Sequence, residues 1–188
     1  MFHKLLSRSV SASRFTPIWD FSFEFRGAYS LNWTSRMSDL FIKKAEVADF
    51  AAAFRIVVEY YEAASVVARE TEDEFRRYYL GPRNGFWLAE SGGAVVGCIA
   101  LREMATPPRS AEIKRMYVQP AHRQHGIAKA LLRALESFAA AARYDSLYLD
   151  SAKGMDTAIA FYQRHGYGPC DRYNDNPQAA IFLRKQLG

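Results

Sequence analysis

A short polar turn between an apolar strand and an amphipathic helix constrains this chain more than any other feature. The turn reads Arg-Gln-His-Gly-Ile-Ala at residues 123–128, after a predicted strand over residues 111–118 and at the start of a predicted helix over residues 124–142. The first N–H groups of a helix have no partners inside the helix, and the helix dipole adds partial positive charge there. Such a turn can therefore hold the oxygens of a phosphate group.

Two residues of the turn suit that task. Gly126 has no side chain that would keep a ligand away from the backbone, and Arg123 carries a guanidinium that can contact phosphate at two points. The turn is not a Walker loop, because no Gly-Lys-Ser/Thr follows, and it lacks the Gly-x-Gly-x-x-Gly of dinucleotide-binding folds. For these six residues taken alone, an ordinary helix N-terminus is the alternative interpretation.

Three segments, in this order, resemble the GNAT superfamily of acyl-CoA-dependent N-acetyltransferases. The strand with the turn at residues 123–128 is similar to the family's Gln/Arg-x-x-Gly-x-Gly/Ala pyrophosphate loop. A predicted strand, Leu-Tyr-Leu-Asp, follows at residues 147–150. Residues 158–167, Ala-Ile-Ala-Phe-Tyr-Gln-Arg-His-Gly-Tyr, are similar to the family's Ala-x-x-x-Tyr-x-x-x-Gly-Phe/Tyr. Together the resemblance covers about residues 39–188.

The resemblance implies a fold and a co-substrate. The expected fold is α/β (α+β), with a GNAT-like mixed, twisted central sheet, helices on both faces, and strands 4 and 5 splayed apart. The co-substrate is acetyl-CoA, whose pantetheine amides would bind free backbone groups as an added strand does. By resemblance, the pantetheine contacts fall on Met116, Tyr117 and Val118, and the pyrophosphate contacts on Arg123, Gln124, His125, Gly126, Ile127 and Ala128.

The implied activity is direct attack of a primary amine on the thioester within a ternary complex. A thioester is already activated, so no covalent enzyme intermediate is required. Tyr162 matches the acid position of the family motif and would protonate the departing thiolate, which suits a phenol with a pKa near ~10. Without the motif, a tyrosine on an amphipathic helix is more simply a packing residue.

Glu112 is the predicted base, acting directly or through a water. A glutamate at this spacing before the turn serves as base in the histone-acetylating branch of the family, and Asp150 and Glu103 are the backups. A surface glutamate paired with Lys114 or Arg115 is the alternative.

Strict alternation along the strand at residues 111–118 predicts which side chains share a face. We expect the backbone N–H of Met116 to meet the oxyanion. We expect the acceptor site to be built from the first helices and from the segments at residues 104–110 and 173–177. Glu112, Lys114, Met116 and Val118 are expected on one face, and Ile113, Arg115 and Tyr117 on the other.

The remaining pattern predicts alternating strands and helices in one domain. Asp49 is expected to cap the first helix, and Thr71 to Glu74 form a capping box for the second, which stops at Gly81. Further strands are predicted at 41–45, 86–90, 94–101 and 179–185, and further helices at 50–64 and 155–165. We predict an N-terminal extension at 1–36, with a short strand at 21–25, and an N-acetyltransferase domain at 37–188.

Charge and composition argue against other classes. Residues 1–36 hold five basic and two acidic residues, so the other 152 residues carry only +2 of the net +5, too little for a broad nucleic-acid-binding surface. Two cysteines and four histidines show no ligand spacing, so we predict no metal. No apolar run approaches the ~20 residues of a membrane span.

These observations predict a cytoplasmic acetyltransferase that acts on a small amine and binds neither nucleic acid nor a membrane. The sequence does not decide whether the protein forms a homodimer. Two alternatives remain at this point. The acceptor could be a protein lysine or N-terminus, which changes the groove but not the reaction. The domain could also be a non-catalytic acyl-CoA-binding sensor.

Overall fold

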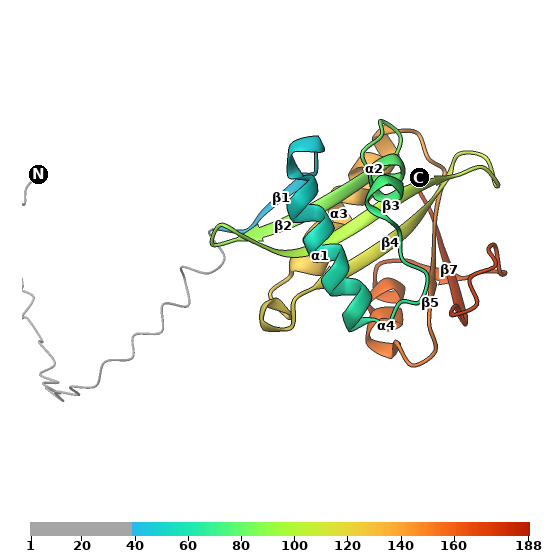
Figure 1. The fold of residues 1–188 in the computed structure, drawn as a ribbon. Coiled ribbons are helices and arrows are strands. Elements are labelled where there is room, and N and C mark those ends of the chain that lie inside the picture. Colours follow the sequence, from blue (N-terminus) through green and yellow to red (C-terminus); the bar gives the residue numbers. More distant parts are fainter. Residues whose placement is uncertain (1–38) are drawn as a thin grey trace, which may run out of the picture. The chain divides into compact units, whose positions relative to one another are not determined.

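The computed structural model describes residues 39–188, so the predicted extension at 1–36 and its strand at 21–25 lie outside the described residues. A seven-stranded mixed sheet forms the centre, with strand order β1-β2-β3-β4-β5-β7-β6 (Figure 1). Strands β4 and β5 pair in parallel, and all other neighbours pair antiparallel. The strands are β1 Phe41–Lys44, β2 Gly85–Ser91, β3 Ala94–Met104, β4 Ser110–Val118, β5 Ser146–Ser151, β6 Gly168–Pro169 and β7 Ile181–Gln186.

Four α-helices cover the two faces of this sheet, which confirms the predicted fold class. Figure 1 shows α1 and α2 in front of the strands and α3 behind them. The helices are α1 Phe50–Ala63, α2 Glu72–Tyr79, α3 Ile127–Ala141 and α4 Asp156–Arg164, with short 3₁₀ turns η1 Val47–Asp49 and η2 Pro120–His122.

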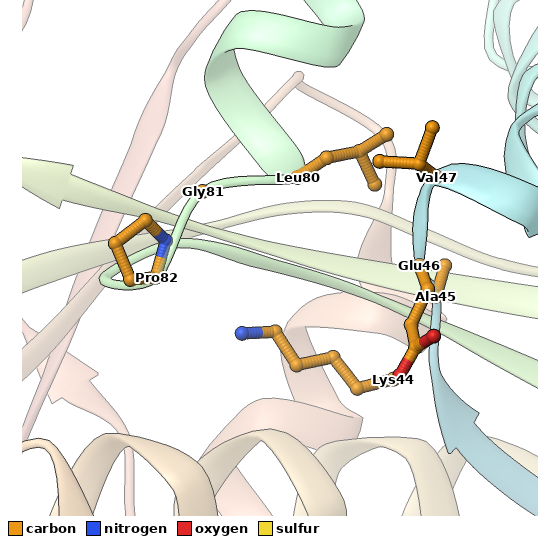
Figure 2. Close-up of a pocket in the computed structure, with 7 residues that line it drawn as sticks. All are labelled: Lys44, Ala45, Glu46, Val47, Leu80, Gly81 and Pro82. Atoms are coloured by element: carbon orange, nitrogen blue, oxygen red, sulfur yellow. The ribbon is translucent and has the colours of Figure 1, made fainter.

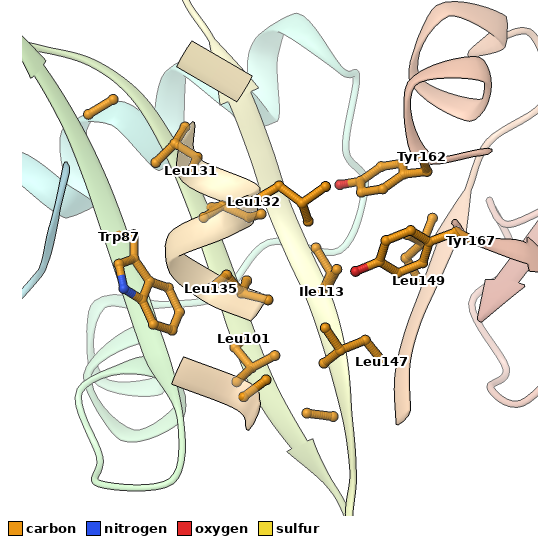
Figure 3. Close-up of a cluster of buried hydrophobic side chains, with 14 of the residues drawn as sticks. Trp87, Leu101, Ile113, Leu131, Leu132, Leu135, Leu147, Leu149, Tyr162 and Tyr167 are labelled. Atoms are coloured by element: carbon orange, nitrogen blue, oxygen red, sulfur yellow. The ribbon is translucent and has the colours of Figure 1, made fainter. Parts of the chain in front are cut away.

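Alternation along the central strands gives each face its own core. In β2, Phe86 and Leu88 pack among α1 and α2, whereas Trp87 and Ala89 pack on the side of α3. Figure 3 shows the α3 side, where leucines of α3 meet the sheet and Tyr162 joins them from α4. Because both faces are covered, β2 and β3 are apolar almost throughout, as strands buried on two sides must be.

The element boundaries depart from the sequence-based expectation at two helix starts. Asp49 does not cap α1; its carboxylate accepts from Lys43 Nζ at 2.9 Å and from the Glu46 N–H at 3.0 Å. Helix α3 begins at Ile127 rather than at residue 124, because Gly126 adopts a left-handed φ of +76° that a helix cannot contain. The Thr71 capping box of α2 is present as predicted.

A β-bulge in β4 makes the predicted alternation wrong after Lys114. Cys98 of β3 lies opposite Tyr117 and Ala100 lies opposite Lys114, so β4 carries one extra residue in between. Arg115 sits at this point with a φ of +57°. From there the order reverses: Met116 packs on the α3 side, and Arg115 and Tyr117 face α1.

Candidate active site

Strands β4 and β5 pair at one end and separate at the other. The parallel pairing runs from Ser110 opposite Ser146 to Glu112 opposite Tyr148, and no further pairing between them occurs within the described residues. Strand β4 continues six residues beyond Glu112, to Val118. Along that stretch the backbone groups that face β5 have no strand to bond, although backbone N–H and C=O groups need partners. The gap can therefore accept an extended ligand with amide groups of its own.

The turn after β4 lies at the open end of this gap. Gln124 and Gly126 both have left-handed backbones, with φ of +66° and +76°, which reverses the chain sharply into α3. The first α3 bond runs from the Ala130 N–H to the Gly126 carbonyl at 3.0 Å. The N–H groups at residues 127–129 therefore have no intrahelical partner and carry the positive end of the helix dipole.

Space at the turn is also suited to a phosphate. A Cβ placed on Gly126 meets no protein atom within 4 Å, so the backbone there is open to a ligand. The Arg123 side chain folds back, and its Nε donates to the Val118 carbonyl at 3.0 Å. That bond joins the turn to the end of β4 and leaves the other guanidinium nitrogens for a ligand.

Tyr162 projects from α4 into the core beside the open part of β4 (Figure 3). The residue is 6% exposed, and its ring packs edge-on against Tyr167 at 5.4 Å. Its hydroxyl makes no hydrogen bond to residues 39–188, so within this range it is free to donate to a ligand. Burial, and then the nearby Tyr60 phenol, raises the pKa of Tyr162, which keeps the proton on the hydroxyl at neutral pH.

Glu112 occupies the point where the two strands part. It is 2% exposed, and its carboxylate is enclosed by donors rather than lying at the surface. The donors are Arg102 at 2.9 Å, Lys114 at 2.9 Å, Tyr173 at 3.0 Å and Asn174 at 3.0 Å. The alternative of a surface glutamate is therefore wrong, because Glu112 is buried, although its expected pairing with Lys114 is present.

Asp150 joins the same network from the end of β5 that pairs with β7 but no longer with β4. Lys114 Nζ lies 3.4 Å from the Asp150 carboxylate, and Asn174 Nδ2 donates to it at 2.6 Å. Lys114 and Asn174 thus each contact both carboxylates, Glu112 and Asp150.

A second buried network, which sequence reasoning missed, holds the bulge. Glu70, in the loop between α1 and α2, pairs with the Arg115 guanidinium and accepts from the hydroxyls of Tyr61 and Tyr79. Arg115 and Glu70 are only 11% and 10% exposed, and Arg115 Nε is buried with no partner within residues 39–188. A glutamate in an exposed-looking loop gave no signal of this role, because its partner is 45 residues away.

Of the two segments expected at the acceptor site, only residues 173–177 lie at the Glu112 network. Gln178, just beyond them, also bridges to the α1–α2 loop: its Nε2 donates to the Ser65 carbonyl at 3.1 Å, and its Oε1 accepts from the Val67 N–H at 3.0 Å. Residues 104–110 instead enter β4 at its paired end. The backup base Glu103 is at that end too, paired with Arg83 at 2.5 Å.

Other features bear on ligands. Among residues 39–188, no cluster of three or more histidine, cysteine or carboxylate side chains could hold a metal ion. In the same range, no helix has the length and apolar character needed to cross a membrane.

Comparison with known proteins decides the family. The family model described as "Acetyltransferase (GNAT) family" matches residues 50–167, more than half of the chain. The chain belongs to the GNAT acetyltransferase family. The match runs from the start of α1 through the turn at residues 123–128 to Tyr167, so it includes β4, β5, α3 and α4 but not residues 173–177.

Relatives of this GNAT chain are enzymes by name. It is 35% identical over 103 residues to rat (Rattus norvegicus) "N-acetyltransferase family 8 member 2", which covers 53% of this chain and 46% of that protein. It is 36% identical over 105 residues to "IAA acetyltransferase" of Azospirillum brasilense, covering 54% and 67%. The chain thus spans about half the length of its mammalian relatives.

Solved structures share the fold at low identity. A Thermoplasma acidophilum PaiA N-acetyltransferase, solved in complex with coenzyme A, superposes with a TM-score of 0.60 at 18% identity, covering 79% of this chain and 99% of that one. At this identity the likeness shows the fold alone. It agrees with a mixed sheet in which β4 and β5 are parallel and separate.

Proposed function

We propose that this GNAT domain, assigned to residues 37–188, transfers an acetyl group from acetyl-CoA to the nitrogen of a small primary amine by direct attack. One observation carries the proposal: β4 loses its β5 partner after Glu112 and ends in a turn whose free N–H groups lie at the mouth of the gap. An extended amide-bearing arm ending in a pyrophosphate suits both parts at once.

The co-substrate contacts follow from this arrangement. Free backbone groups of Met116, Tyr117 and Val118 are available to the pantetheine amides. The pyrophosphate would meet the N–H groups of Gln124, His125, Gly126, Ile127 and Ala128. Arg123 would contribute its guanidinium, because its own N–H donates to the Pro120 carbonyl at 3.3 Å. The Met116 N–H, in the bulged stretch, is our proposed donor to the oxyanion, since a fixed dipole costs no reorganisation during the reaction.

Tyr162 is the proposed acid for the departing thiolate. Its phenol remains protonated because its pKa is raised, and its oxygen is the polar atom that α4 brings toward the gap. A free thiol has a pKa near ~8.5, below that of a free phenol, so the transfer would be uphill for a thiolate in water. Burial disfavours both anions, so a thiolate that leaves inside the gap would also be more basic and could take the proton from Tyr162.

The Glu112–Asp150 carboxylate pair is the proposed destination of the amine proton. Glu112 has both oxygens occupied by donors, so it would receive the proton through a neighbour or a water. Asp150 lies beyond the last residue of β5 that pairs with β4, although it still pairs with Phe182 of β7. Lys114 and Asn174 each contact both carboxylates, so a change of charge on one carboxylate alters the electrostatic environment of the other.

A panel of primary amines with acetyl-CoA and a thiol-release readout tests this function. We expect thiol release that depends on the amine and yields an equal amount of N-acetylated product by mass spectrometry. Coenzyme A binding at the turn with no release for any small amine or lysine peptide would leave the sensor role and remove the proposed activity.

A further inference from the structure

A pocket outside the candidate active site contains an unusual lysine. It has a volume of about 480 Å³, within the range of ~300–1,000 Å³ typical of ligand pockets. It lies beside β1, which two other strands separate from β4. Figure 2 shows Lys44 running beneath the turn at Gly81 and Pro82. The lining residues are Lys44, Ala45, Glu46, Val47, Leu80, Gly81 and Pro82.

The surroundings of the Lys44 amine are apolar. Its Nζ lies 4.1 Å from the centre of the Phe138 ring and 6.0 Å from that of Trp87. Gly85 makes room for this packing, because a Cβ there would lie 2.4 Å from the Trp87 ring and 3.0 Å from Lys44 Cε. No carboxylate within residues 39–188 forms a salt bridge with Lys44, although Glu46 lines the same pocket.

The amine nevertheless reaches solvent. Lys44 Nζ makes no hydrogen bond within the described chain, and it is not among the buried unpaired atoms there, so part of it faces the pocket. Burial lowers the pKa of Lys44, since a charged ammonium is disfavoured in this apolar setting. A larger share of neutral amine is therefore present than at an ordinary lysine.

The adjacent Lys43 provides the opposite environment. It points to the other side of β1, and its Nζ lies 2.9 Å from both the Asp49 and Glu90 carboxylates. The hydrogen bond to Glu90, and then that to Asp49, raises the pKa of Lys43. Two neighbouring lysines thus differ in ion pairing, in apolar contact and in the direction of the pKa shift.

We propose that Lys44 is a covalent acetylation site that reacts directly with acetyl thioesters. The neutral amine attacks the thioester carbonyl, the new C–N bond forms as the C–S bond breaks, and the amine proton passes to the departing thiolate through water. The products are an amide on Lys44 and a free thiol, so no further reactant is needed. The product amide carries no charge, so the partial desolvation that disfavours the ammonium at this position no longer applies to it.

This inference does not rest on the proposed enzymatic activity. The reaction takes place in the pocket beside β1 and uses neither the gap between β4 and β5 nor the turn at residues 123–128. The probe that separates the two is S-acetyl-N-acetylcysteamine, an acetyl thioester that lacks the pyrophosphate. It can reach Lys44 without the turn.

The experiment treats the full chain with isotope-labelled acetyl-CoA or with the labelled cysteamine thioester, and quantifies labelled peptides by mass spectrometry. We expect Lys44 to be labelled severalfold faster than Lys43 with both reagents, because two carboxylates hold the Lys43 amine as an ammonium and no carboxylate within residues 39–188 pairs with Lys44. The K44R variant should lose this label with no gain at Lys43. A protease that cleaves outside residues 43–44, with fragmentation, distinguishes the two positions.

Two results would overturn the inference. Equal or faster labelling of Lys43 would mean that the pocket gives Lys44 no added reactivity. Labelling of Lys44 by acetyl-CoA alone, and not by the cysteamine thioester, would mean that the transfer depends on coenzyme A binding rather than on the pocket.

Discussion

The two ends of β4 differ in how they pair with the neighbouring strands β3 and β5. At the paired end, Ser110 and Ala111 are bonded to β3 on one side and to β5 on the other. Beyond Glu112, only the β3 side is paired, and the bulge at Arg115 interrupts even that register. The first end is built as a sheet interior, whereas the second exposes backbone groups that a ligand can use.

On the side that faces β5, side chains rather than strand pairing hold the open end in place, while β3 stays paired on the other side. The Glu70–Arg115 pair anchors the bulge to the α1–α2 loop, and the Glu112 network spans from β4 to residues 173–174. Buried ion pairs contribute little net stability, but removing one partner is costly. The comparison indicates that the shape of the gap depends on a few polar contacts, those of the Glu70–Arg115 pair and of the Glu112 network.

The largest expected effect separates the two tyrosines of one motif, Tyr162 and Tyr167. We expect Tyr162→Phe to lower kcat by about 10³-fold, within the ~10²–10⁴ range of acid catalysis, with little change in acetyl-CoA affinity. Steady-state kinetics and isothermal titration with coenzyme A measure the two quantities.

Tyr167→Phe is the matched control. Its ring packs against Tyr162, but its hydroxyl donates to Glu136 at 2.9 Å, away from the gap. We expect a modest loss of stability, about 1 kcal/mol for one hydrogen bond, and nearly unchanged kcat. Equal losses of kcat in both variants would mean that Tyr162 acts through packing.

The next largest expected effect is a loss of unfolding free energy in the variant Glu112→Gln, at the point where β4 and β5 separate. Glu112→Gln keeps the shape but leaves Arg102 and Lys114 beside a neutral amide in a buried site. Breaking a buried pair costs about 3–5 kcal/mol, and we expect the low end because Arg102 is partly exposed. Urea unfolding measures it, and an unchanged midpoint would contradict the structural role of this carboxylate.

Replacing the other carboxylate of the pair, Asp150, by its amide should affect the reaction rate more than the stability. We expect Asp150→Asn to lower kcat/KM at pH 7 by about 10²-fold, the lower limit for a lost base, because Glu112 remains. Free amines have a pKa near ~10, so the loss should shrink as the pH rises and the substrate deprotonates unaided. A pH-independent loss would assign Asp150 to binding instead.

The fold could be predicted from the sequence because its signals are local. The Thr71 capping box, the hairpin at Gly92–Gly93 and the apolar strands each depend on residues within a few positions, and all appear as predicted. The two motifs around residues 123–128 and 158–167 also depend on short spacing. The match of the family model to residues 50–167 confirms the resemblance drawn from them.

The geometry of the candidate site could not be predicted in the same way. Nothing near Arg115 in the sequence signals a bulge, because its positive φ is stabilised by a pairing with Glu70 that only the fold creates. The same is true of Glu112, whose partners Tyr173 and Asn174 are 61 and 62 residues away. The gap between β4 and β5 likewise depends on contacts between residues far apart in the sequence, so the sequence implied it only through the family resemblance.

The smallest expected effect compares two glycines with similar backbones. Gly126 at the turn and Gly93 in the β2–β3 hairpin have φ of +76° and +79°, and neither has a protein atom within 4 Å of a built Cβ. Alanine at either position should cost about 1–2 kcal/mol of unfolding free energy, since a Cβ disfavours a left-handed backbone. Gly93→Ala therefore measures the strain alone.

Only Gly126→Ala should also weaken acetyl-CoA binding. Its methyl group would project where the pyrophosphate approaches the free N–H groups of α3, so we expect about a tenfold higher KM for acetyl-CoA with kcat largely kept, the pattern of lost uniform binding. Equal changes in KM for both variants would mean that strain, transmitted through the domain, causes the effect. An unchanged KM in Gly126→Ala would mean that the turn does not approach the pyrophosphate closely, which would remove the functional meaning of the open end of β4.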